Sequence, residues 1–367
     1  MEKIMVTRSS MPSYEEFIDR IRPLWETRWL TNMGVYHREF EEALRGYLEV
    51  PYVSLMVNGH MALELTIQAM GFPEGSEVIT TPFTFVSTTH AIVRNRLEPV
   101  FCDIKADDYT IDEDKIEALI TEKTVAIVPV HVYGNICNVE RIQEIADRNG
   151  LKVIYDACHS FGERYKGLGV GNFGDVSVFS FHATKVFNTI EGGAAVFADK
   201  ALYEKLYNLK NFGIRGEELV EDVGANAKMN EFSAIMGLCN LKEIDKNIAD
   251  RKEKANLYIE RLKGNAFIKP PCFDRTEVIY NYGYFPVEFS GEGLRDRMYE
   301  KLREEGIYAR KYFYPLTSEA LCFRGRYDNL PLENARRAAS SVLVLPLYPE
   351  LESGVIEKIV KILRNNK

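Results

Sequence analysis

The stretch "DVSVFSFHATKVFNTIEGGAA", residues 175–195, joins a strand-like apolar run to a single lysine and then to a Glu-Gly-Gly turn. The run at 175–181 is short, apolar and bounded by polar and small residues, which predicts a buried strand. Lys185 stands just after this strand. Because parallel α/β sheets bind ligands outside the carboxyl ends of their strands, a lysine here is a candidate for chemistry, although a solvated loop charge is the simpler explanation.

Short apolar runs alternate with segments of helical periodicity from about residue 50 to residue 200. This alternation predicts an α/β fold with βαβ units around a mainly parallel sheet. The other predicted strands are "EVITTP" (77–82), "EPVFCDI" (98–104), "TVAIVPVHV" (124–132) and "LKVIYDAC" (151–158). The predicted helices between them cover 87–96, 112–121 and 138–150.

Local signals mark several helix ends. Ser13 stands three residues before Glu16, and Thr110 stands three residues before Glu113, which is the spacing of a capping box. Each pair predicts a helix that begins one residue after the hydroxyl residue. Gly150 predicts a helix end, because glycine readily adopts the left-handed conformation found there.

A long helical segment at 229–262 separates two parts of the chain. Its charge is concentrated in the second half, as in a connector between domains. We expect an N-terminal segment with a large domain at 1–245, and the connector helix with a small C-terminal domain at 246–367. Strand-like and helical runs mix in 263–367, which predicts an α+β architecture for the small domain.

Composition narrows the classes of function. The 367 residues carry a formal net charge of −8 and show no basic cluster, so nucleic acid and anionic membranes are not expected partners. The N-terminus lacks the pattern of a signal peptide, and no run of eighteen uncharged apolar residues occurs. We therefore expect a cytoplasmic protein.

The six cysteines are scattered along the chain without a CxxC pair. In a chain of this length they predict buried free thiols in a reducing compartment rather than disulfides. They also predict no zinc site, and no other metal site is expected.

Asp156 ends the apolar run at 151–158, where a buried carboxylate needs a partner. Taken alone, it is more simply a helix N-cap or part of a surface ion pair. Lys185 could be a desolvated amine whose lowered pKa lets it form a Schiff base. Together the two residues match pyridoxal phosphate (PLP), which needs a lysine for its aldehyde and an acid to hold its pyridine nitrogen protonated.

The phosphate of such a cofactor needs a cradle of N–H groups. In "VNGHMALELTIQAM" (57–70), a glycine opens a predicted helix. The amides of Gly59, His60 and Met61 would point at an anion there, at the positive end of the helix dipole. Ser180, five residues before the lysine, adds a hydroxyl. A glycine before a helix is common, so this signal is weak by itself.

A flat aromatic cofactor is usually held by an aromatic side chain as well. Phe83 and Phe85 follow the predicted strand at 77–82. Ordinary core packing is the simpler explanation for each of them. Phe85 becomes the better stacking candidate only by alignment with other sequences.

The order of these motifs resembles the sugar aminotransferases of the DegT/DnrJ type, a branch of the fold-type I PLP enzymes. The matching motifs are the glycine-initiated helix, "PFTFVST", "PVHVYGN", "DACHSFG", "SFHATK" with its "EGG", and "GANAKMNEFSA". The match runs from "WLTNMG" at 29–34 to "LPLYP" near residue 349. It implies a large domain with a mainly parallel mixed sheet, a smaller C-terminal α+β domain, and a homodimer with shared active sites.

The resemblance also implies roles for residues. Lys185 would carry PLP and move the proton, and Asp156 would pair with the pyridine nitrogen. The remaining cofactor contacts implied are Phe85 on the ring, Gly59, His60, Met61 and Ser180 on the phosphate, and Asn226 reaching the phosphate from the neighbouring subunit.

Two departures from the family pattern concern only the cofactor contacts. Many members have Ser-Gly-Thr where this chain has Asn58-Gly59-His60, so one hydroxyl contact to the phosphate is replaced by an imidazole or lost. His159 stands where many members have glutamine. It could hydrogen-bond the phenolic oxygen of the cofactor or stack beside its ring.

Some members have histidine in place of the lysine and are dehydratases, whereas Lys185 keeps transamination available here. The resemblance implies L-glutamate as donor, PLP and its amine form PMP as carriers, and a keto sugar linked to a nucleotide as acceptor. "SFHATKVFNTIEGG" looks like the branch that converts dTDP-4-keto-6-deoxy-D-glucose to dTDP-4-amino-4,6-dideoxy-D-glucose. A UDP-linked 4-keto sugar and a dTDP-linked 3-keto sugar stay open as alternatives.

Substrate contacts are expected from four residues, for each of which a structural role is at least as good an explanation: Thr31, His182, Arg310 and Tyr314. Two hypotheses of another class stay open. A PLP-binding regulator without turnover would keep its cofactor spectrum unchanged when glutamate is added. A nucleotide-binding module with Lys185 on its surface would be colourless.

Overall fold

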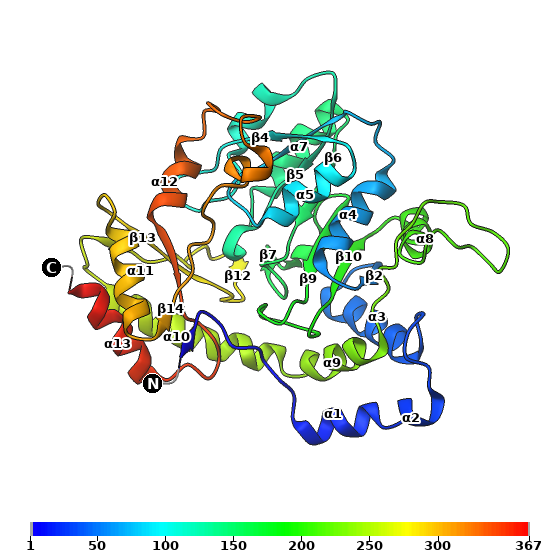
Figure 1. Ribbon diagram of the computed structural model, residues 1–367, viewed down its shortest axis with the longest axis horizontal. Coiled ribbons are helices and arrows are strands. Elements are labelled where there is room, and N and C mark those ends of the chain that lie inside the picture. Colours follow the sequence, from blue (N-terminus) through cyan, green and yellow to red (C-terminus); the bar gives the residue numbers. More distant parts are fainter. Residues whose placement is uncertain (1–2, 366–367) are drawn as a thin grey trace.

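A seven-stranded sheet forms the centre of the molecule (Figure 1). The computed structural model describes residues 3–365. In spatial order the strands are β2 (Tyr52–Met56), β10 (Gly193–Phe197), β9 (Val176–Ser180), β6 (Lys152–Asp156), β5 (Thr124–Val128), β3 (Glu77–Thr80) and β4 (Glu98–Phe101). The last five are parallel, and β10 runs antiparallel to both β2 and β9. The predicted mainly parallel mixed sheet is therefore confirmed.

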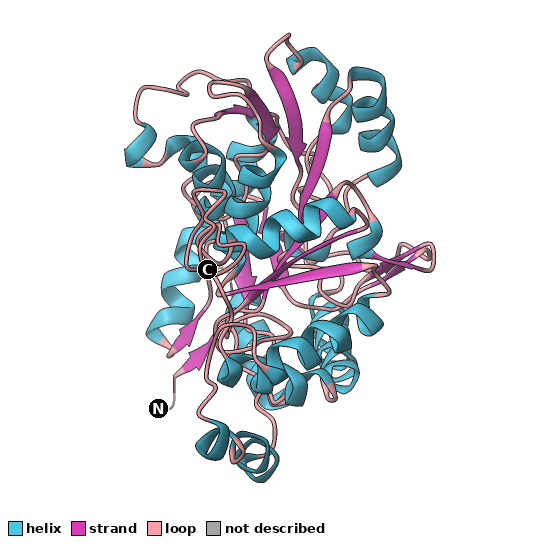
Figure 2. Ribbon diagram, turned by 90° about the vertical axis from the view of Figure 1, so that its right-hand side faces the viewer, coloured by secondary structure: helices cyan, strands magenta, loops and turns pink. Residues whose placement is uncertain are grey.

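Helices lie on both faces of this sheet, as Figure 2 shows from the side. One face packs against α4 (Gly59–Met70), α5 (Val86–Arg94) and α8 (Lys200–Leu209). The other packs against α3 (Val35–Leu48), α7 (Val139–Asn149) and α9 (Glu231–Leu241). Successive side chains of a strand alternate between the faces, so Ile154 enters the first core while Val153 and Tyr155 enter the second.

A smaller α+β part follows the large sheet along the chain. Its antiparallel sheet has the order β11 (Ile268–Lys269), β13 (Phe285–Phe289) and β15 (Val342–Leu345). Its helices are α10 (Ile244–Leu262), α11 (Leu294–Glu304), α12 (Glu333–Ser341) and α13 (Ser353–Arg364). Phe285 and Tyr258 share one continuous core cluster with Phe40 of the large part. The domain boundary predicted at residue 245 is not tested by this arrangement and stays a prediction.

The remaining elements are short. They are β1 (Ile4–Met5), α1 (Tyr14–Ile21), α2 (Leu24–Thr27), α6 (Glu113–Ile116), β7 (Arg164–Tyr165), β8 (Leu168–Gly169), β12 (Val278–Ile279) and β14 (Ile307–Tyr308). Single 3-10 turns lie at Glu117–Leu119, Val132–Gly134, Val170–Asn172, Thr317–Glu319 and Leu321–Phe323. β1 pairs with β14, so the strand Ile4–Met5 packs on the small part, which the sequence did not indicate.

The local helix signals had mixed outcomes. Ser13 caps α1 by accepting a hydrogen bond from the Glu16 amide at 3.1 Å, and Gly150 ends α7 at a φ of 66°, so both predictions are confirmed. The capping box at Thr110 was wrong: its hydroxyl donates to Asp108 instead, and α6 begins only at Glu113. The competing local bond of an aspartate two residues before it explains the difference.

Two further expectations need correction. The helical segment at 229–262 is two helices, α9 and α10, rather than one continuous helix. The six cysteines are free thiols, but Cys272 and Cys322 are exposed rather than buried. Within residues 3–365, no helix is long and apolar enough to cross a membrane.

Candidate active site

Two neighbouring parallel strands bring Asp156 and Lys185 to the same edge of the sheet. Asp156 is the last residue of β6, and Ser180 is the last residue of β9, which pairs with β6. The chain then turns, with the Lys185 amide donating to the His182 carbonyl at 2.9 Å. The Asp156 carboxylate contributes to the electrostatic environment of the lysine amine. The two residues singled out in the sequence therefore lie in one site.

The Asp156 carboxylate is buried and held by two hydrogen bonds. The Thr88 hydroxyl donates to Oδ2 at 2.7 Å, and the Cys158 amide donates to Oδ1 at 3.2 Å. Thr88 is itself 3.0 Å from the Thr84 hydroxyl. Hydrogen bonds to an ionised carboxylate are stronger than neutral ones. The Thr88 hydroxyl on α5, itself in contact with Thr84 just before this helix, therefore fixes the position of the Asp156 carboxylate at the strand end.

The Lys185 amine faces a tyrosine from the small part of the molecule. Its Nζ donates to the Tyr284 hydroxyl oxygen at 3.0 Å. Burial lowers the pKa of the lysine, but Tyr284 and Cys158 act in the opposite sense, and the pKa lies above its ordinary value. A lysine pKa lowered by desolvation was one of the alternatives that the sequence left open, and the raised pKa contradicts it because Tyr284, from a distant segment, acts against the effect of burial.

His159 is neutral, and its tautomer follows from its contacts. Burial lowers the pKa of His159 well below its ordinary value. The Tyr133 amide donates to Nδ1 at 3.0 Å, so Nδ1 is the acceptor and the ring hydrogen sits on Nε2. The ring centroid lies 4.4 Å from that of Tyr284 and 5.9 Å from that of Phe313. His159 thus presents an N–H donor beside the lysine.

The start of α4 packs directly on the end of β9. A Cβ at Gly59 would lie 2.6 Å from the Cβ of Ser180, so only glycine permits this approach. The Asn58 side chain accepts from the Met61 amide at 2.8 Å. Of the three amides expected to be free for an anion, Met61 is therefore already occupied by the helix cap, which leaves those of Gly59 and His60.

The His60 imidazole is engaged with protein groups on both nitrogens. Nδ1 lies 2.8 Å from the Ser87 hydroxyl, and Nε2 lies 3.1 Å from the Glu64 carboxylate. The side chain therefore joins α4 to α5. Its backbone amide, rather than its ring, is the group that remains for an anion.

The two phenylalanines after β3 have different surroundings. Phe83 is fully buried, whereas Phe85 is 59% exposed. Phe85 lines a cavity of about 330 Å³ together with Arg310, Tyr314 and neighbouring residues of 310–316. The exposed ring matches the role proposed for a stacking residue, and the buried ring is core packing.

The other expected site residues lie at the periphery. His182 is exposed, and its Nδ1 accepts from the Thr184 amide at 3.2 Å. Asn226 is exposed and accepts from Lys228 Nζ at 2.9 Å. Thr31 is exposed on the turn before α3, and no hydrogen bond joins it to the Lys185 site in the part of the chain that is described.

Thr88, Cys158 and Tyr284 are site residues that sequence reasoning missed. Thr88 lies three residues after Phe85, on the side of α5 that faces the strand end. Its helical spacing from Thr84 was the available signal. Tyr284 lies 99 residues from Lys185 along the chain, so no local pattern could have linked the two.

The geometry joins a lysine amine, a hydrogen-bonded carboxylate, an N–H donor and a helix N-terminus at one sheet edge. Comparison with known proteins agrees with this combination. Residues 13–364 match the DegT/DnrJ/EryC1/StrS aminotransferase family. The chain belongs to this family.

Two relatives of this aminotransferase are both named dTDP-4-amino-4,6-dideoxy-D-glucose transaminase. The protein from Shigella dysenteriae is 42% identical over the whole of both chains. The protein from Escherichia coli is 43% identical, with 98% of each chain covered. The predicted family and the predicted enzyme class, a sugar aminotransferase, are therefore confirmed.

A solved structure of another sugar enzyme shows the same fold. DesI, crystallised in the presence of its TDP-sugar product, is 33% identical and superimposes with a TM-score of 0.94. The match covers 99% of this chain and 93% of DesI. The predicted α/β fold class of this aminotransferase is thus confirmed over nearly its full length.

Proposed function

We propose that this aminotransferase binds PLP at the Lys185 site and transfers the amino group of L-glutamate to dTDP-4-keto-6-deoxy-D-glucose, giving dTDP-4-amino-4,6-dideoxy-D-glucose. The observation that carries the proposal is that Lys185, in the loop after β9, and Asp156, at the end of the neighbouring strand β6, lie in one site, where the carboxylate acts electrostatically on the lysine amine. The substrate rests on the two full-length relatives that bear the name of this reaction.

The residues present fit PLP. The close packing of Gly59 on Ser180 brings two helix-terminal amides and a hydroxyl to one spot, as a phosphate requires. The Asp156 carboxylate would hold the pyridine nitrogen, and the exposed Phe85 ring would offer a face for stacking. When bound, PLP supplies an electron sink that makes removal of the α proton feasible.

The chain's own groups would then divide the remaining work. Lys185 takes the proton from the amino donor and returns it, and later delivers a proton to one face of the sugar carbon. His159, whose Nε2 carries the ring hydrogen, would donate a hydrogen bond to the bound cofactor. Thr88 and the Cys158 amide hold the Asp156 carboxylate in a fixed orientation through their hydrogen bonds.

The cavity beside Phe85 suits a nucleotide diphosphate. Arg310 lines it and provides a cation for a pyrophosphate, whereas Lys311, also in the wall, is paired with Asp296 at 2.6 Å. Tyr314 and Tyr312 provide aromatic faces for a base or sugar. The Arg310 guanidinium lies 5.2 Å from the centre of the Tyr312 ring, which orients it along this wall. Arg310 and Tyr314 are therefore kept as proposed substrate contacts.

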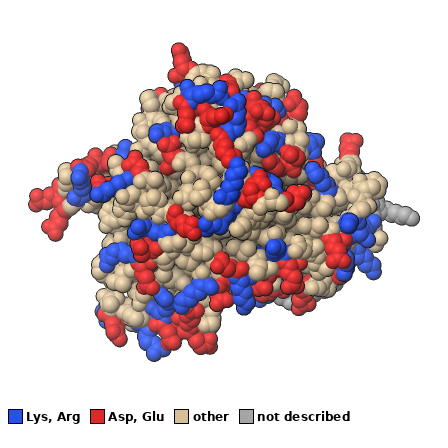
Figure 3. Space-filling view, turned by 180° about the vertical axis from the view of Figure 1, so that it is seen from behind, with Lys and Arg blue, Asp and Glu red and all other residues tan. Residues whose placement is uncertain are grey.

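A homodimer is also proposed, with Asn226 serving the site of the partner. The segment 211–226 projects from the body beside α8 (Figure 1). It carries exposed apolar side chains, among them Val220 and Val223, which are 66% and 89% exposed. Figure 3 shows mixed charge over the opposite face of the molecule, with acidic groups at the end of this projection. A projecting segment with exposed apolar side chains suits contact with a second copy.

Mixing two inactive variants tests the shared site. Lys185→Ala and Asn226→Ala each should lose most activity as homodimers. If Asn226 serves the partner, hybrids contain one site with both defects and one intact site, so activity returns to as much as about a quarter of the wild-type value after equal mixing. Activity that stays absent after subunit exchange, verified by mass, would contradict the shared site.

Product analysis tests the reaction and its substrate. The purified enzyme, PLP, L-glutamate and dTDP-4-keto-6-deoxy-D-glucose should give a product whose proton NMR spectrum shows large couplings on both sides of the aminated carbon. A small coupling toward position 5 would show the galacto product instead. Turnover only with a UDP-linked or 3-keto sugar would overturn the proposed substrate, and absence of any change with glutamate would favour a regulator.

Replacing the lysine tests the site. Lys185→Ala should lower transamination by about 10³-fold or more, since both the cofactor link and the proton carrier are lost. Lys200→Ala is the matched control, because this lysine on α8 is 74% exposed. Circular dichroism should show both variants folded. If Lys185→Ala keeps its turnover, the assignment of Lys185 is wrong.

A further inference from the structure

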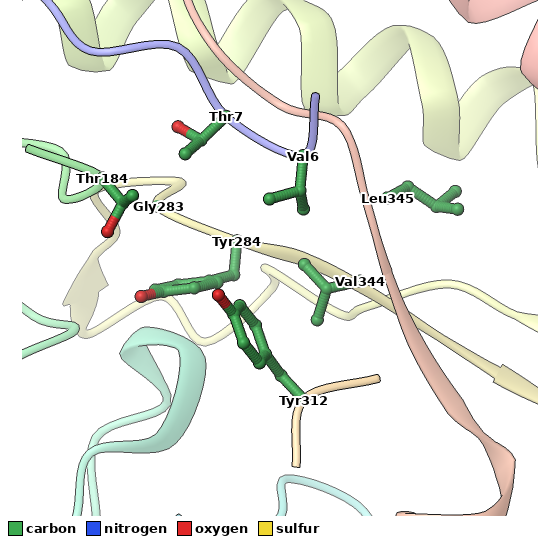
Figure 4. A pocket seen from close by; sticks show the side chains of 8 residues that line it. All are labelled: Val6, Thr7, Thr184, Gly283, Tyr284, Tyr312, Val344 and Leu345. Atoms are coloured by element: carbon green, nitrogen blue, oxygen red, sulfur yellow. The ribbon is translucent and has the colours of Figure 1, made fainter. Parts of the chain in front are cut away.

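Tyr284 reaches the active site from the small part of the molecule. It stands one residue before β13, and its ring faces a small cavity lined also by Thr184, Gly283 and Tyr312 (Figure 4). In Figure 4 its hydroxyl points toward the segment that carries Thr184, the residue before the lysine. The 3.0 Å contact with Lys185 Nζ is the result of this placement.

A buried polar network fixes the backbone just before this tyrosine. The Asn281 side chain donates to the carbonyls of His159 and Phe161 at 2.9 and 3.0 Å, and accepts from the Gly283 amide at 2.8 Å. The Glu163 carboxyl accepts a hydrogen bond from the backbone amide of Asn281 at 3.1 Å. This network ties the segment of Tyr284 to the loop of His159, so the hydroxyl cannot move independently of the site.

The space around the segment is equally restricted. A Cβ at Gly283 would lie 2.9 Å from Val186, the neighbour of Lys185. The ring of Tyr284 also packs against His159, with centroids 4.4 Å apart. Glycine therefore lets the chain pass close to the lysine loop, and the aromatic contact sets the direction of the hydroxyl.

We propose that Tyr284 is a catalytic residue whose hydroxyl holds the amine of Lys185 in place during the periods when that lysine is not joined to the cofactor. The inference rests on the proposed function, because it gives the tyrosine a task only if Lys185 carries protons. The proton itself moves between lysine and substrate. The tyrosine oxygen accepts an N–H from the ammonium form, and the tyrosine keeps its own proton throughout.

Electrostatics agree with a neutral hydroxyl in this role. Burial raises the pKa of Tyr284, so the phenol stays protonated at neutral pH. A hydrogen bond that stabilises the ammonium makes the lysine a stronger base. Loss of the hydroxyl oxygen should therefore leave Lys185 less basic as well as less well oriented.

The test uses the full chain without cofactor. Trace acetic anhydride acetylates only neutral amines, and mass spectrometry gives the rate at Lys185 relative to exposed Lys200 in the same sample. In Tyr284→Phe the rate at Lys185 should rise about tenfold at pH 8.5, since one hydrogen bond to a charged group is worth about one pKa unit. The difference in acetylation rate at Lys185 between this variant and the wild type should become smaller as the pH rises toward 10.5.

Tyr282→Phe is the matched control. Tyr282 is buried in the same segment and has no hydrogen bond to Lys185 among the described residues. This variant should react like the wild type. If Tyr284→Phe fails to fold, Tyr284→Leu should give the same rise. An unchanged acetylation rate at Lys185 would overturn the inference. A rise of equal size at every pH would overturn it too, because it would show only that the reagent reaches Lys185 more easily.

Turnover by the wild type distinguishes a failure of the proposed function from a failure of the role of Tyr284. If the wild type converts glutamate while Tyr284→Phe leaves lysine reactivity unchanged, only the role of Tyr284 falls. If the wild type neither binds PLP nor converts glutamate, the proposed function is wrong, and so is the catalytic role of Tyr284. Tyr284→Phe should also slow the glutamate half-reaction about tenfold, with its pH profile displaced toward acid.

Discussion

The Thr88 hydroxyl shows how one side chain outside the recognised motifs supports the chemistry. It donates to Asp156 at 2.7 Å and is fully buried. Thr88→Val keeps the shape but leaves a carboxylate oxygen without this donor, so the free energy of unfolding should fall by about 1–3 kcal/mol. Affinity for PLP should fall as well, because the anion loses its fixed orientation.

Chemical denaturation and PLP titration measure the two effects of Thr88→Val. Thr66→Val is the control, since the hydroxyl of this buried threonine donates to the Ala62 carbonyl within α4 and not to a charged group. Thr66→Val should lower the free energy of unfolding by less than about 1 kcal/mol. Equal losses in both variants would contradict a special role for the bond to Asp156.

At the residue scale, the sequence identified the groups that stand at strand ends but not their partners. Asp156 ends one apolar run and Lys185 follows another, so their position at the same edge of the sheet followed from the parallel arrangement. Thr88 and Tyr284 reach the same spot from other elements, over 68 and 99 residues of chain. Such contacts depend on tertiary packing, which local patterns do not contain.

At the scale of single elements, the position of the start of α4 depends on the absence of a side chain at Gly59. Gly59→Ala would place a Cβ 2.6 Å from that of Ser180, and the helix would have to shift away from β9. We expect a loss of stability of about 1–3 kcal/mol and weaker binding of PLP. Gly46→Ala in α3 is the control, because a Cβ there meets nothing within 4 Å.

The control variant should behave in the opposite way. Gly46 lies in a helix interior, where alanine is favoured over glycine by about 0.5–1 kcal/mol. Thermal unfolding of both variants, with and without PLP, checks the pair. Similar stability of Gly59→Ala and the wild type would show that α4 can move without cost, and would contradict the close-packed cradle.

Elements with strong periodicity were predicted well, and elements defined by their neighbours were not. β6 and β9 fall where their apolar runs predicted them. β10 was missed, because Gly193–Phe197 begins with small residues that looked like a turn, yet it is fully buried between β2 and β9. A Cβ at Gly193 would lie 2.5 Å from the Asn58 backbone, which explains why the strand begins with glycine.

At the scale of the whole molecule, polar contacts fasten the small part to the large sheet. Asp103, just after β4, accepts from the amides of Asn334 and Ala335 at the start of α12, at 3.1 and 2.9 Å. Tyr109 donates to Glu288 of β13 at 3.1 Å. Together with the shared core, these contacts hold Tyr284 and the cavity wall in register with the lysine, which explains how remote segments complete one site.

Acid should destabilise the whole molecule through its buried histidines. Burial lowers the pKa of His37 and of His131 to about 3, and that of His159 well below its ordinary value. The unfolded chain binds protons at these residues below about pH 6.5, whereas the folded chain does not. Their contribution to stability is therefore present above pH 6.5 and is lost as the pH falls toward 3.

Replacing one of these histidines isolates the effect. His131→Asn keeps an acceptor for the Cys137 amide, which now donates to Nδ1 at 3.2 Å, but removes a titrating group. The fall in the free energy of unfolding between pH 6 and pH 4.5 should become less steep by about 1.4 kcal/mol per pH unit, the value of one proton. His182→Asn, on an exposed ring, is the control. Urea denaturation of the cofactor-free chain across this range measures the slopes. An unchanged slope for His131→Asn would mean that His131 is already protonated in the folded state, because only then does its removal leave the proton balance of unfolding unaltered.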